Sequence, residues 1–83
     1  MPNPKYIADQ LLRIQTEYRE YPEAQLDSFR RIASNADILE TSEELTPEKA
    51  LEIQQFCADF VASDVGRQEL IEQRAARLQG YRQ

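Results

Sequence analysis

The stretch ASDVGRQEL, residues 62–70, combines residue types that occur in several kinds of binding site. A small residue stands four positions before Gly66, as in the turn of a DNA-reading helix-turn-helix, and arginines follow. The apolar residue that this motif needs about six positions after the glycine is replaced by Glu72. A net charge of −5 would also repel phosphate. We therefore predict that Ser63 or Asp64 caps a helix and that Gly66 lies at the corner of a helical hairpin.

Residues for acid–base, metal or covalent chemistry are scarce in this chain. It has no histidine and one cysteine, Cys57, so Ser-His-Asp, Cys-His and histidine-based metal sites cannot form within one chain. A calcium-binding loop starting at Asn35 fails, because Glu40 replaces the required glycine and Thr46 replaces the required glutamate. Glycine-rich phosphate loops are also missing from the sequence. We predict a protein without catalytic activity, metal or cofactor, with Cys57 in its core.

The segment Leu26-Asp27-Ser28-Phe29 resembles the Asp-Ser-Leu at which acyl carrier proteins accept a phosphopantetheine arm. The acidic, four-helix form of that family also matches the composition of this chain, and the resemblance implies a prosthetic group on Ser28. In the family, however, the serine opens a helix after a long loop, whereas Ser28 falls inside a helix expected to begin at Pro22. We therefore expect Ser28 to be a solvent-facing helix residue without a prosthetic group.

The tyrosines indicate protein binding more strongly than Ser28 indicates a prosthetic group. Tyrosine can bury its ring while its hydroxyl stays in water, so it is favoured at protein interfaces. Leu12 lies off the apolar seam of its helix, and its burial would need a second apolar surface. We predict a protein interface that includes Tyr6, Leu12, Tyr18, Tyr21 and Tyr81. In the alternative interpretation, Tyr18 and Tyr21 only close the end of the helical bundle.

The elements that must position these residues are helices, three of them led by proline. Asn3-Pro4 and Thr46-Pro47 each place a capping side chain before a proline at the first helical position. Pro22 both ends the first helix and opens the second. No segment alternates apolar and polar residues as a strand would. The spacing predicts an all-α fold in one domain, residues 1–83, as a compact bundle of four helices at about 4–21, 22–36, 47–62 and 64–80, either up-down or more splayed.

Apolar spacing also predicts which helix faces meet in the core. The third helix has the widest apolar arc and is expected at the centre. On the fourth helix, the apolar pattern continues through Leu70, Ile71, Ala75 and Leu78. The first helix carries a heptad-like seam that, with the small size of the chain, favours a homodimer unless the core uses the seam. The seam consists of Ile7, Leu11, Ile14, Tyr18 and Tyr21.

Charge is unevenly distributed along the chain. Residues 41–66 carry a net charge of −5, and residues 67–83 carry +2. This polarity suits protein partners better than a nucleic-acid duplex. We expect an acidic surface of Glu40, Glu43, Glu44 and Glu48 to steer a basic region of the partner. Alternatively, the six acidic residues between positions 43 and 64 could mimic nucleic acid and block a basic groove.

The start of the chain and its short apolar runs indicate where the protein works. The first ten residues, MPNPKYIADQ, lack the basic and apolar stretches of a secretory signal, and the apolar runs are too short to cross a bilayer. Together with the single cysteine, this predicts a cytoplasmic protein with no membrane contact. The sequence favours a small regulator, adaptor or assembly factor that binds another protein through apolar and aromatic helix surfaces.

Overall fold

The computed structural model describes residues 2–81, except for the side chain of Tyr81. These residues form α1 (Pro4–Thr16), α2 (Pro22–Asn35), α3 (Pro47–Ala62) and α4 (Asp64–Tyr81), with no strand between residues 2 and 81. The prediction of an all-α fold with four helices is confirmed. The boundaries of α2, α3 and α4 agree with the predicted ranges to within one residue.

The starts of α1 and α3 have the capping bonds that the sequence predicts. The Asn3 Oδ1 accepts a hydrogen bond from the Lys5 amide at 3.1 Å, at the start of α1. At the start of α3, the Thr46 Oγ1 accepts one from the Lys49 amide at 3.2 Å. Helix α2 has no side-chain cap, because Tyr21 precedes its first proline. Each cap satisfies an amide that has no partner inside its own helix.

Helix α1 is shorter than predicted and ends at Thr16 instead of residue 21. The Tyr18 amide bonds the Arg13 carbonyl at 2.7 Å, a five-residue step that closes the helix with a wider turn. Pro22 then keeps Tyr21 out of helical geometry (φ −122°, ψ 87°). Residues 17–21 therefore form a loop, which places Tyr18 and Tyr21 at a corner between two helices.

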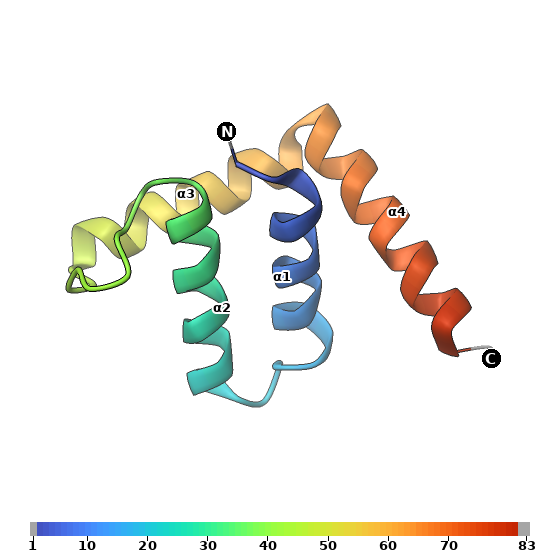
Figure 1. Ribbon diagram of the computed structural model, residues 1–83, viewed down its shortest axis with the longest axis horizontal. Helices are drawn as coiled ribbons and strands as arrows, with labels where there is room; N and C mark the ends of the chain where they lie inside the picture. The colour runs from blue at the N-terminus through green and yellow to red at the C-terminus, as the bar shows by residue number, and fades with distance from the viewer. Residues whose placement is uncertain (1, 82–83) are drawn as a thin grey trace.

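Pairwise packing defines the arrangement of the helices, with α1 against α2 and α4, and α3 against α2 and α4. Helices α1 and α2 form an antiparallel hairpin, α3 passes across one end of it, and α4 turns back to pack on α1 while diverging from α2 (Figure 1). The radius of gyration is 13.0 Å, slightly above the roughly 12 Å expected for a domain of this length. Of the two arrangements left open by the sequence, the helices adopt the more splayed one.

The centre of the core is α1, not α3 as the apolar arc predicts. Leu12 is 0% exposed, so the expectation that it lies off the core-facing seam is wrong. Because α1 lies between α2 and α4, two of its faces are covered, and Leu12 needs no second protein for its burial. The buried apolar side chains are Ile7, Ala8, Leu11, Leu12, Ile32, Ala33, Leu39, Ile53, Cys57 and Leu70.

The outer faces of α3 and α4 are exposed. From α3, Ile53 and Cys57 are buried, whereas Leu51 is 66% exposed. On α4 only Leu70 of the predicted apolar pattern is buried, and Ile71, Ala75 and Leu78 lie in solvent. None of the helices within residues 2–81 is long and apolar enough to span a bilayer.

Candidate protein-binding surfaces

The corner between α1 and α2 brings together two of the predicted interface tyrosines. The Gln25 side chain, on α2, donates hydrogen bonds from its Nε2 to the carbonyls of Tyr18 (2.6 Å) and Arg19 (2.8 Å). The Tyr21 amide also bonds the Tyr18 carbonyl at 3.1 Å. These bonds satisfy loop carbonyls that no helix pairs, and so they hold the corner in one conformation.

A hollow of about 550 Å³ opens at this corner. Tyr21 is 64% exposed beside it, and Tyr18 is half-buried. Two aromatic rings and a proline give the hollow apolar walls, while two glutamates bring negative charge to it. The lining residues are Glu17, Tyr18, Tyr21, Pro22, Glu23 and Ala24. Such a combination can hold an apolar side chain or the stem of a basic one.

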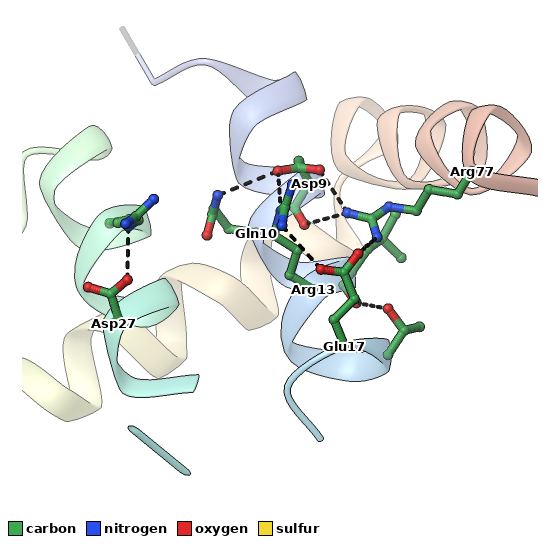
Figure 2. Close-up of polar contacts among 9 residues, drawn as sticks. Asp9, Gln10, Arg13, Glu17, Asp27 and Arg77 are labelled. Atoms are coloured by element: carbon green, nitrogen blue, oxygen red, sulfur yellow. Dashed lines mark hydrogen bonds and ion pairs between the residues drawn. The ribbon is translucent and has the colours of Figure 1, made fainter. Parts of the chain in front are cut away.

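A ring of four ion pairs lies next to the hollow and joins α1 to α4 (Figure 2). The Arg77 Nη2 lies 2.7 Å from Asp9 Oδ1, and its Nη1 lies 2.6 Å from Glu17 Oε1. The Arg13 Nε and Nη1 contact the same carboxylates, at 3.0 Å from Asp9 and 3.1 Å from Glu17. The pKa of Arg13 is held above its ordinary value, first by the hydrogen bond to Asp9 and then by Tyr18. Each charge has an opposite partner, so the ring is suited to fixing α4 on α1.

The ring also argues against DNA binding by α4, because it engages one of the arginines that would contact phosphate. Arg77 is one of the arginines that would have to face phosphate, but it is directed back onto α1 (Figure 2). The Ser63 Oγ accepts a hydrogen bond from the Gly66 amide at 2.9 Å, so Ser63 is the cap of α4 and occupies an amide that an anion would need. Gly66 has a steric role, because a Cβ there would overlap the Phe60 carbonyl oxygen. The prediction of a capped hairpin corner is confirmed.

The remaining predicted interface residues lie apart from this corner. Tyr6 is half-buried and, together with Glu40, lines a separate hollow of about 510 Å³ between α2 and the connector that follows it. Leu12 belongs to the core and is not available to a partner. Tyr81 is the last residue of α4, and its side chain lies outside the described part of the structure. The predicted set therefore does not form one continuous surface.

The predicted acidic residues lie on the connector 36–46 and the first turn of α3. Glu40, Glu43, Glu44 and Glu48 are all exposed. Glu43 is engaged locally, since its Oε2 accepts the Glu40 amide at 3.1 Å and its Oε1 lies 3.9 Å from Lys49 Nζ. Lys49 also donates to the Ile38 carbonyl at 3.0 Å. Part of this acidic segment therefore organises the connector, which leaves fewer carboxylates for a partner.

Two side chains with nucleophilic atoms are buried. Ser28 is 2% exposed, so the expectation that it faces solvent is wrong. It lies on α2 facing α1, at the bottom of a hollow of about 280 Å³ that Gln10 and Arg13 also line. Cys57 lies in the core as predicted, and burial raises the pKa of its thiol to about 11. Neither group is presented for covalent chemistry.

Sequence reasoning missed Gln25 and the tie between Arg77 and Asp9. The ring joins residues 68 positions apart, and no local spacing indicates such a pair. No protein-family model, curated protein sequence or solved structure matches this chain. The function of the protein must therefore be inferred from its own surfaces.

Proposed function

We propose that this protein binds another protein, without catalysis, through the corner between α1 and α2. The observation that carries the proposal is the hollow lined by Tyr18, Tyr21 and Pro22, with Tyr21 largely exposed. Tyrosines at such positions contribute a large contact area at a low cost in side-chain entropy. The protein would act as a small regulator, adaptor or assembly factor.

The chemistry of the hollow supports a partner that inserts a lysine or arginine side chain. Glu17 and Glu23 bring carboxylates to the hollow, and the tyrosine rings offer faces that attract a cation. The aliphatic stem of the inserted residue would pack on Pro22 and Ala24. Since Glu17 already pairs with Arg13 and Arg77, Glu23 would supply the less compensated charge.

We place this interaction in the cytoplasm. The chain has one cysteine, so it forms no internal disulfide that would point to an oxidising compartment. Its buried thiol suits a compartment in which cysteines stay reduced.

The test is a comparison of tagged wild type with Tyr21→Ala in lysate from the source cells, with co-purifying proteins quantified by mass spectrometry. Because Tyr21 is 64% exposed, the substitution should leave the fold intact while the partner is lost. Leu51→Gln, at an equally exposed site on α3, is the matched control and should keep the partner. Equal recovery of every protein with Tyr21→Ala would reject the proposal.

The salt dependence of binding to the recovered partner separates this proposal from nucleic-acid mimicry. Binding through the tyrosine corner should weaken only a few-fold from low to physiological salt, because only one cation enters the hollow. A steep loss, together with sensitivity to Glu44→Gln and Glu48→Gln but not to Tyr21→Ala, would indicate that the acidic segment blocks a basic groove instead.

A further inference from the structure

The outer face of α4 carries an apolar stripe that no other part of the described structure covers. The stripe, defined here as the apolar Ile71, Ala75 and Leu78 with the polar Gln68 at its start, follows alternating spacings of three and four residues. Ile71 is 59% exposed and Leu78 is 63% exposed. Spacings of this kind place side chains along one side of a helix, as in a coiled-coil seam.

The opposite face of α4 is already occupied. Leu70 is buried there, and Arg77 is held on α1 by Asp9 and Glu17. One face of α4 therefore packs on the rest of the protomer and another faces solvent. The ion-pair ring holds the helix in this rotational orientation (Figures 1 and 2). An exposed seam on an anchored helix is suited to pairing with another helix.

The charges that flank the stripe are complementary to those of a second copy of this chain. Arg67 and Arg74 lie along one side of the stripe, and Glu72 and Gln79 lie along the other. In a parallel pair of α4 helices, the first side of each copy faces the second side of the other. Arg67 of one copy then meets Glu72 of its partner, five positions further along, and the two-fold axis repeats this ion pair.

An antiparallel pair of the same helices would be disfavoured by charge. In an antiparallel pair, each flank of the stripe faces the same flank of the other copy. The flank with Arg67 and Arg74 would then face the same two arginines, and the flank with Glu72 would face the other Glu72, so like charges would repel. Among residues 2–80, Arg74 makes no ion pair within the protomer, and Arg67 contacts only the exposed Asp64, at 2.7 Å. Both arginines can therefore turn to a partner at little cost.

We propose that the protein forms a parallel, two-fold symmetric dimer through the α4 stripe, with Arg67 of each copy paired to Glu72 of the other. Three apolar side chains per copy make a short seam, so the dimer should be reversible, with a Kd on the order of 100 µM. None of the stripe residues lines the hollow at the tyrosine corner, so each dimer would present two corners to partners. A partner with two copies of its own site would then bind with higher avidity.

Sedimentation equilibrium of the purified full chain over a wide concentration series measures this dimer. Ile71→Glu should weaken it at least about tenfold, because a carboxylate would enter the centre of the seam. Leu51→Gln, on the outer face of α3, is the matched control and should have no effect. Circular dichroism checks that both variants keep the wild-type helix content. A monomer at every concentration, or equal losses in the two variants, would overturn the proposal.

Charge exchange tests the pairing itself. Arg67→Glu should weaken the dimer several-fold, and the double variant Arg67→Glu, Glu72→Arg should restore it, because the exchanged charges meet again across the two-fold axis. Failure of the double variant to recover affinity would overturn the assigned pair.

Disulfide trapping tests the direction of the helices. In a Cys57→Ser background, Leu78→Cys should cross-link to itself under mild oxidation, since a parallel pair places equivalent seam residues opposite each other. A mixture of Ile71→Cys and Leu78→Cys chains should give only like-with-like products. Preferential cross-links between position 71 and position 78 would show an antiparallel pair and reject the parallel arrangement.

Discussion

Helices α1 and α4 pack against each other, yet their apolar residues lie in opposite environments. On α1, four apolar side chains are buried, because α2 and α4 cover it from two directions. On α4, a comparable pattern of apolar residues leaves only Leu70 inside, and Ile71 and Leu78 remain in solvent. Apolar spacing indicates that a helix has an apolar face. The number of helices that pack against it decides how many of its apolar residues are buried in the core.

The largest contrast between the two helices should appear when leucines are shortened. Leu12→Ala removes buried side-chain volume from α1 and should lower the free energy of unfolding by about 2–5 kcal/mol. Leu78→Ala, on the exposed face of α4, should change it by less than about 0.5 kcal/mol. Urea denaturation followed by circular dichroism measures both. Similar losses in the two variants would mean that the α4 stripe is buried in solution.

The glycines of α4 should respond in opposite directions. Gly66→Ala would place a methyl group on the Phe60 carbonyl and should lower the free energy of unfolding by about 2–3 kcal/mol, because the α3–α4 corner must shift. At Gly80 a Cβ meets nothing within 4 Å, so Gly80→Ala should be neutral or stabilise the helix by up to about 1 kcal/mol. A harmless Gly66→Ala would show that the corner is looser than described.

Removal of one arginine should loosen α4 while leaving the hairpin intact. Arg77→Met keeps much of the side-chain stem but breaks two ion pairs of the ring, and it should cost about 1–2 kcal/mol. Hydrogen exchange should quicken on α4 before it does on α2, since α4 would lose its polar tie to α1. Arg74→Met, at an exposed site on the same helix, should leave exchange unchanged. Uniform quickening in both helices would argue against a separable α4.

Alkaline pH should destabilise the fold through Cys57. Burial raises the pKa of the folded thiol from 9.0 to about 11, so the folded state holds the proton more tightly than the unfolded state does. The stability from this difference is complete below pH 9 and declines by roughly 1 kcal/mol per pH unit until about pH 11. Cys57→Ala should show a shallower decline in denaturation series at pH 8 to 11. Identical slopes would mean that the thiol is not buried.

Much of this architecture could be predicted from local signals. Proline with a preceding cap marked the starts of α1 and α3, and Ser63 marked the start of α4, because capping depends on residues close in sequence. The end of α1 is not predicted correctly, since the wider turn closed by the Tyr18 amide on the Arg13 carbonyl has no signature in the apolar spacing. Boundaries set by such a turn leave little trace in the sequence.

The candidate surfaces were predicted less well than the helices. Tyr18 and Tyr21 meet at one corner as neighbours in sequence, whereas Tyr6 lines a different hollow and Leu12 is in the core. The prediction for Leu12 is wrong because a single apolar seam implies one neighbouring helix, whereas α1 packs against both α2 and α4. The bond between Arg77 and Asp9 depends on the path of the whole chain, so no local pattern could reveal it.

The junction at Ser63 allows only one rotational setting of α4. This residue ends α3 and caps α4, so no linker separates the two helices. One extra residue after Ser63 would turn α4 by about 100° about its own axis. Arg77 would then leave Asp9, and the solvent-facing stripe would rotate toward the flank of the protomer. The length of the junction, to a single residue, therefore sets which side of α4 is available outside the molecule.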